Sequence, residues 1–88
     1  MGFPYYLVAF DSNTTAMELR RELDSSGVAY AVMPTPRAVT KSCGLSIRFD
    51  ARDYPRVEET IASVAESPSL YAFYRASGDS RKPEFIPL

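Results

Sequence analysis

The alternation of short strand-like segments with two amphipathic helical segments constrains the fold of this 88-residue chain more than any other feature. Two segments repeat apolar residues at helical spacing, residues 15–26 and residues 53–66. Four others have the aromatic and β-branched composition or the two-residue alternation of strands: residues 5–10, 28–33, 45–49 and 70–75. The predicted order is therefore β-α-β-β-α-β.

The first helical segment carries signals for both of its ends. Thr15 followed by Glu18 has the form of a capping box, and Asn13 or Thr14 is an alternative cap. Gly27 is suited to end the helix, because glycine tolerates the left-handed conformation that follows many helices.

This order predicts an α+β fold, the ferredoxin-like two-layer sandwich. Right-handed crossovers place both helices on one face of a four-stranded, mainly antiparallel sheet. The other face should carry small and polar residues such as Ser46 and Arg48 beside some of the tyrosines, and a homodimer could form through it. Residues 1–76 are expected to form a single compact domain. Residues 77–88 have no periodicity and two prolines, so we expect a flexible C-terminal tail.

Composition and charge exclude several classes of function. The net charge is −1 with acidic and basic residues interleaved, so no basic stripe favours nucleic acid. The longest apolar run, residues 5–10, is too short to cross a bilayer, and the N-terminus lacks the pattern of a signal peptide, so we expect a cytoplasmic protein. The chain has no histidine, which excludes Cys–His and Ser–His–Asp catalysis and disfavours zinc. We predict no metal and no cofactor.

The connector between the second and third predicted strands, residues 34–44, holds the only cysteine of the chain, Cys43. A two-residue turn would join these strands, and longer ordered loops in small domains tend to be functional. With one cysteine, the chain can form no internal disulfide, and any accepting thiol must come from another molecule. The predicted site comprises Cys43 as the thiolate, with anion-stabilising and loop residues around it: Arg37, Lys41, Ser42, Gly44, Pro36 and Thr40.

Each of these residues has a chemical reason to lie near a reactive sulfur. Arg37 and Lys41 supply positive charge, and the Ser42 hydroxyl and the amides around Gly44 can donate hydrogen bonds to a thiolate. Gly44 also leaves space beside the sulfur, and the prolines stiffen the loop. The alternative is that Cys43 is a buried packing residue, that the cations are solvated loop charges and that the prolines protect a sheet edge.

Part of this pattern resembles a known family. Pro34-Thr-Pro-Arg37, a hydroxyl residue and then Ser42-Cys43-Gly44-Leu45 before a short strand are similar to the selenium/sulfur (Se/S) carrier protein-like family, small bacterial proteins formerly catalogued as a domain of unknown function. The strand opening at Tyr5 and the helix closing at Gly27 also resemble that family, so the similarity covers residues 5–75. It implies that Cys43 carries sulfur or selenium as a persulfide or selenopersulfide.

Three functional hypotheses follow. The first is a thiol carrier that takes a chalcogen atom from a persulfide or selenium donor protein and passes it to an acceptor protein, with little turnover of its own. The second is a regulatory module of the ACT type that binds a small molecule near the tyrosines. The third is a non-catalytic adaptor domain that binds a protein through the open sheet face or through residues 85–88.

Overall fold

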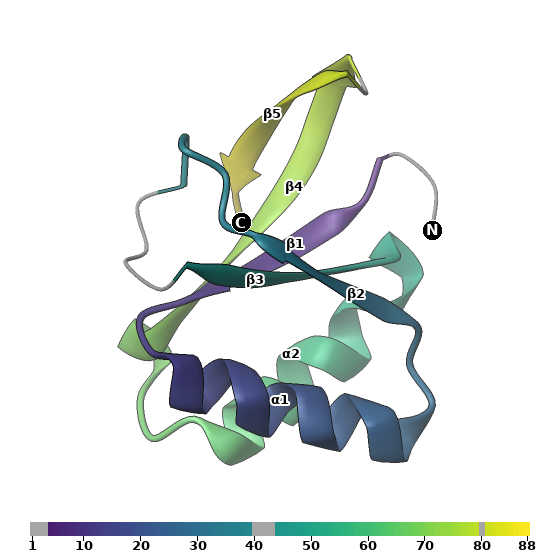
Figure 1. Cartoon of the computed structure of the whole chain (residues 1–88). Helices are drawn as coiled ribbons and strands as arrows, with labels where there is room; N and C mark the ends of the chain where they lie inside the picture. Colours follow the sequence, from purple (N-terminus) through teal and green to yellow (C-terminus); the bar gives the residue numbers. More distant parts are fainter. Residues whose placement is uncertain (1–3, 40–43, 80) are drawn as a thin grey trace.

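Five antiparallel strands and two α-helices make up the described part of the chain, residues 4–39, 44–79 and 81–88 of a computed structural model (Figure 1). In chain order the elements are β1 (Tyr6–Phe10), α1 (Asn13–Ser26), β2 (Tyr30–Pro34), β3 (Leu45–Phe49), the 3₁₀ turn η1 (Ala51–Asp53), α2 (Tyr54–Val64), the 3₁₀ turn η2 (Pro68–Leu70), β4 (Tyr71–Asp79) and β5 (Lys82–Pro87). The order across the sheet is β2-β3-β1-β4-β5. The predicted α+β class is confirmed, with both helices on one face of the sheet.

The prediction of four strands in a β-α-β-β-α-β order is wrong, because a fifth strand follows β4. Residues 77–88, which we expected to form a tail, supply the end of β4 and all of β5. The two strands pair from Tyr74 with Pro87 to Asp79 with Lys82. At the turn between them the Asp79 carboxylate accepts a hydrogen bond of 2.8 Å from the Arg81 amide. The order is therefore β-α-β-β-α-β-β, which departs from the predicted ferredoxin-like arrangement.

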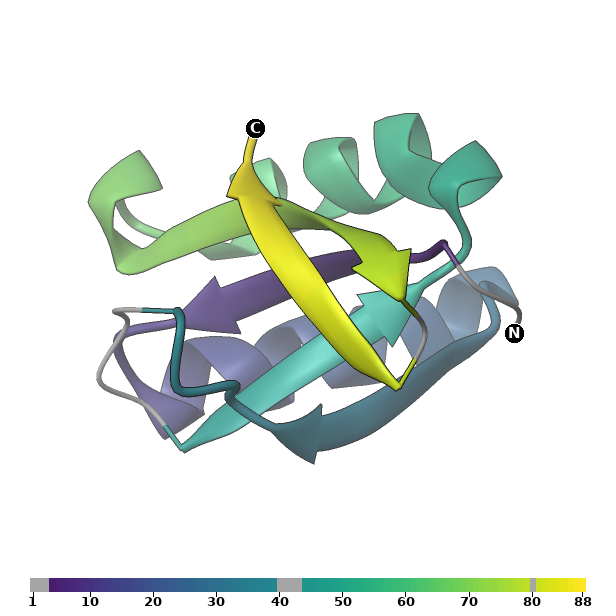
Figure 2. The same ribbon diagram turned by 90° about the horizontal axis from the view of Figure 1, so that it is seen from above.

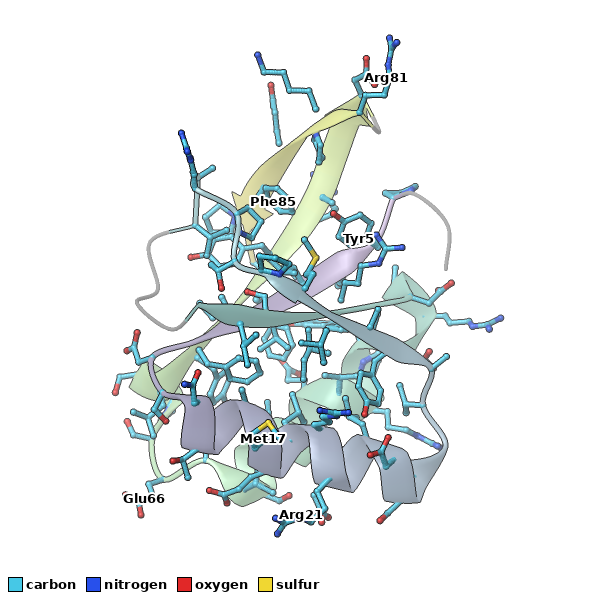
Figure 3. The ribbon with its side chains drawn as sticks, viewed as in Figure 1. Tyr5, Met17, Arg21, Glu66, Arg81 and Phe85 are labelled. Atoms are coloured by element: carbon cyan, nitrogen blue, oxygen red, sulfur yellow. The ribbon has the colours of Figure 1, made fainter. Side chains whose placement is uncertain are left out.

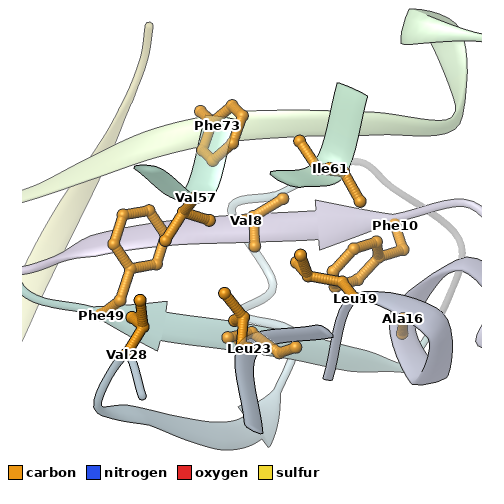
Figure 4. Close-up of a cluster of buried hydrophobic side chains, with 11 residues drawn as sticks. Val8, Phe10, Ala16, Leu19, Leu23, Val28, Phe49, Val57, Ile61 and Phe73 are labelled. Atoms are coloured by element: carbon orange, nitrogen blue, oxygen red, sulfur yellow. The ribbon is translucent and has the colours of Figure 1, made fainter. Parts of the chain in front are cut away.

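The main core lies between the helices and the sheet (Figure 4). It forms because alternate residues of β1, β3 and β4 point toward the apolar stripes of α1 and α2. Rings of Phe49, Tyr54 and Phe73 meet edge to face, with centroids 5.0 to 6.0 Å apart. The buried members of this core are Val8, Phe10, Ala16, Leu19, Leu23, Val28, Ile47, Phe49, Val57, Ile61 and Phe73.

The N-terminal cap of helix α1 lies one residue before the segment in which we expected it. Ser12 is the cap, and its hydroxyl accepts a hydrogen bond of 3.2 Å from the Thr15 amide. The prediction of Thr15, Asn13 or Thr14 as the cap is therefore wrong. At the other end, Gly27 has φ of 75° and donates its amide to the Leu23 carbonyl, as predicted.

Tyr54, a half-buried residue at the start of α2, leads to an expected pH dependence of stability. Burial, together with the hydrogen bond of 2.9 Å that its hydroxyl donates to Glu58, raises the pKa of Tyr54 above its usual value of 10.0. The folded state therefore keeps this proton at pH values where the unfolded state has lost it, so stability falls as the pH rises above about 10. Urea unfolding at several pH values tests this. From about pH 9 to about pH 11, we expect the free energy of unfolding to decrease less in Tyr54→Phe than in the wild type. Equal losses in the two proteins would contradict this assignment.

Candidate functional site

The connector between β2 and β3 is closed at its base by hydrogen bonds that extend the strand pairing. The Thr35 amide donates to the Gly44 carbonyl at 3.1 Å. The Thr35 and Ser46 hydroxyls are 2.8 Å apart, and Ser46 is completely buried. Because Pro36 disfavours a helical conformation at the residue before it, Thr35 is biased toward the extended backbone that this pairing needs. The base of the connector is thus held from both strands.

A tight turn follows this base. The Val39 amide donates to the Pro36 carbonyl at 3.0 Å, which closes a four-residue β-turn. Arg37 and Ala38 occupy the two central positions, and both are exposed. The turn therefore presents the Arg37 guanidinium to solvent.

Val39 fastens the turn to the sheet face opposite the helices. Its side chain is only 6% exposed and belongs to a second apolar cluster with Leu7, Ala9 and Tyr74. Met33, Ala72 and Phe85 pack against this cluster. The connector is therefore held at its base by hydrogen bonds and at Val39 by apolar contacts.

Strand β5 helps to cover the same face. Seen from above, β5 crosses over the sheet, and the described part of the connector lies beside it (Figure 2). Phe85 of β5 points toward Tyr5 (Figure 3), with ring centroids 6.4 Å apart, and the Arg48 guanidinium carbon lies 4.6 Å from the centre of the Tyr5 ring. Ser46 and Arg48 do occupy this face as predicted, but they share it with a buried apolar cluster. The predicted homodimer through this face stays a prediction.

Four of the predicted site residues, Thr40, Lys41, Ser42 and Cys43, lie outside the described residues. Of the other three, Pro36 opens the turn, Arg37 is exposed on it, and Gly44 is exposed immediately before β3. A Cβ atom placed on Gly44 would meet none of the described atoms within 4 Å beyond its chain neighbours. None of the atoms in the described ranges therefore crowds the residue that is peptide-bonded to Cys43.

Sequence reasoning missed the three residues that hold the connector in place: Thr35, Val39 and Ser46. An available signal was Val39, the only branched aliphatic side chain in the loop of residues 34–44. The Thr35–Ser46 contact joins residues 11 apart in sequence and has no local pattern.

Within the described ranges, no group of three or more potential ligand side chains could hold a metal ion. No helix in those ranges is long and apolar enough to cross a membrane.

The protein is therefore a small α+β protein whose only cysteine follows a β-turn that Val39 holds against the sheet. A family model described as "Putative Se/S carrier protein-like" matches residues 5–67. The chain belongs to this Se/S carrier protein-like family, in agreement with the resemblance of its Pro-Arg and Ser-Cys-Gly segments. Neither the curated proteins nor the solved structures contain a match.

Proposed function

We propose that the protein is a thiol carrier that holds sulfur or selenium on Cys43 as a persulfide or selenopersulfide. The observation that carries the proposal is the structure of the connector between β2 and β3. Contacts with the sheet hold some of its residues in place, whereas the residues that flank the cysteine segment are exposed. Thr35, Val39 and Ser46 hold its frame, whereas Arg37 and Gly44 on either side of residues 40–43 are exposed. Membership of the Se/S carrier protein-like family supports the same chemistry.

The transfer proceeds by thiol exchange. The Cys43 thiolate attacks the outer sulfur of a donor persulfide, one S–S bond forms as another breaks, and the donor leaves as a thiolate. An acceptor thiolate then attacks the outer sulfur on Cys43 and restores the free thiolate. No net oxidant or reductant is needed. Selenium follows the same steps when the donor carries a selenopersulfide.

The residues around the thiol have separate roles in this proposal. The positive charges of Arg37 and Lys41 favour the thiolate, and the Ser42 hydroxyl and the Gly44 amide can donate hydrogen bonds to it. Pro36 and Thr40 belong to the loop that presents the sulfur. Gly44 has no side chain to obstruct a donor or acceptor sulfur. A donor protein and an acceptor protein are the implied partners, and the carrier needs no cofactor.

The test is to incubate the protein with a persulfide donor, such as a cysteine desulfurase with its substrate, and to measure the intact mass. We expect one added sulfur atom, removed by a reductant and absent in Cys43→Ser. Arg37→Ala should slow the loading without lowering the melting temperature, because Arg37 is exposed. No adduct under conditions that load another sulfur-carrying cysteine protein would contradict the proposal.

Two matched measurements separate this function from the alternatives. A small-molecule module would show a ligand-induced rise in melting temperature that survives Cys43→Ser. An adaptor domain would bind its protein partner equally well with either residue at position 43. A carrier requires the thiol in both its loading and its delivery.

A further inference from the structure

Strand β2 is an edge strand whose free side points away from the rest of the sheet. It is the first strand in the sheet order, and among the described residues it pairs with β3 alone. An exposed edge of this kind attracts another strand, so proteins usually block or cover it. We propose that a second copy of this chain covers it, with the two β2 strands paired antiparallel about a two-fold axis at Val32.

The backbone groups needed for this pairing are available. The bond from the Thr35 amide to the Gly44 carbonyl identifies those two residues as a hydrogen-bonded pair. Hydrogen-bonded pairs alternate along an antiparallel ladder, so Ala31 and Met33 also bond inward to β3. The amide and carbonyl groups of Tyr30 and Val32, and the carbonyl of Pro34, therefore point outward.

Two-fold pairing uses these groups without conflict. Val32 lies opposite Val32 of the second copy, and the two residues exchange both of their hydrogen bonds. Tyr30 lies opposite Pro34 of the second copy, where the Tyr30 amide donates to the proline carbonyl. Pro34 lacks an N–H group, but it still serves as an acceptor.

At the opposite edge of the sheet, prolines in β5 block pairing with a further strand. The Leu88 amide donates to the Phe73 carbonyl, so by the same alternation the outward residues of β5 are Pro83, Phe85 and Pro87. Two of these three residues have no N–H group to offer. Strand β2 has no comparable block, because proline occupies only its last position.

Side chains beside the free edge of β2 favour the same partner. Strand β2 contains no charged residue, and Val32 is 42% exposed. Met17 of α1, labelled in Figure 3, is 47% exposed on the side of the helix along which β2 runs. An isolated apolar edge of this kind gains stability when the same edge of a second copy covers it.

The charged groups near β2 favour the antiparallel orientation. The Tyr30 hydroxyl donates a hydrogen bond of 2.6 Å to the Asp24 carboxylate, and Arg20 interacts with the same hydroxyl. Charge is therefore gathered at the Tyr30 end of the strand. An antiparallel pair sets this end against the Pro34 end of the second copy, away from that copy's own Asp24 and Arg20, whereas a parallel pair would set Asp24 beside Asp24 and Arg20 beside Arg20. The two-fold arrangement also brings the Tyr30 end of one copy next to the base of the connector of the other.

The test compares two substitutions at Val32 by light scattering after size exclusion, over a wide range of protein concentration. The wild type should approach twice the mass of one chain as its concentration rises. Val32→Pro removes an outward N–H group but no bond to β3, so it should reduce the mass to that of one chain. Val32→Thr keeps the N–H group and the β-branched shape, so it should remain a dimer.

Hydrogen exchange provides a readout that does not depend on the folding of a variant. In the wild type, the Tyr30 and Val32 amides should exchange slowly at high concentration and at least tenfold faster after dilution to the monomer. The Ala31 and Met33 amides, which bond to β3, should show no such dependence. A wild type that is monomeric at every concentration would overturn the proposal, as would a dimer that Val32→Pro leaves intact or one in which the Tyr30 and Val32 amides are unprotected.

Discussion

Val39→Asp is expected to lower the free energy of unfolding by about 3 kcal/mol or more, because it places a carboxylate in an apolar cluster. Val39 is 6% exposed and lies with Leu7, Ala9 and Tyr74, none of which carries a positive charge that could pair with a buried carboxylate. The aspartate must either stay protonated or leave the cluster. In both cases the turn of the connector loses its contact with the sheet.

Ala38→Asp is the matched control for this prediction. Ala38 precedes Val39 in the same turn but is exposed, so the same charge there should change stability by less than about 0.5 kcal/mol. Urea unfolding of both variants measures the difference. Similar losses in the two variants, or no loss in Val39→Asp, would show that Val39 does not fasten the connector.

The same pair of variants connects the fold to the proposed chemistry. If the frame of the connector sets the environment of Cys43, the rate of Cys43 alkylation as a function of pH should change in Val39→Asp. In Ala38→Asp the profile should keep its shape apart from the effect of one added exposed charge. The comparison is made in native buffer, below the concentration of urea at which either variant unfolds.

The helices and the first four strands could be predicted because their signals are local. Leu19 and Leu23 repeat at helical spacing, and Leu45, Ile47 and Phe49 alternate along a strand. Burial then followed these periods, with the helical residues and Ile47 and Phe49 in the main core. The cap was misplaced by a few residues, because Ser12, Asn13, Thr14 and Thr15 all have side chains that can cap a helix.

Strand β5 could not be recognised from the sequence, because two prolines in a segment without periodicity indicate an irregular tail. Pro83 and Pro87 are compatible with a strand only because they occupy outward positions at the sheet edge. That fact depends on the register with β4, and the sequence of β5 alone does not determine a register. The local signal was the run Ser77-Gly78-Asp79, whose residue types favour turns. In the structure these residues end β4, and Gly78 has φ of 85°.

The contacts that hold the connector could not be predicted from the sequence either. Its residue types predicted a thiolate with nearby cations, and Arg37 is exposed as that hypothesis requires. What holds the connector is non-local: Thr35 contacts Ser46 across the ladder, and Val39 contacts side chains of β1 and β4. Such contacts appear only when the strands are placed in register.

Phe85→Ala is expected to lower the free energy of unfolding by about 2 kcal/mol, since it removes a half-buried ring from the second apolar cluster. The loss includes the edge-to-face contact with Tyr5, whose ring centroid lies 6.4 Å away. Ile86→Ala is the control, because Ile86 is the next residue of β5 and is exposed. It should cost less than about 0.5 kcal/mol.

The difference between the half-buried Phe85 and the exposed Ile86 also shows how to test whether β5 binds a partner. Deleting residues 77–88 would remove any adaptor surface there, but it would also uncover the cluster that holds Val39, so lost binding and a loosened connector would be confounded. Exposed residues of the strand, Ile86 and Leu88, can be changed to alanine while Phe85 is kept. If Phe85→Ala speeds Cys43 alkylation and the Ile86 and Leu88 variants do not, β5 supports the connector. If Phe85→Ala costs no more stability than Ile86→Ala, β5 does not help to hold the second cluster, and the deletion becomes a valid test of the adaptor hypothesis.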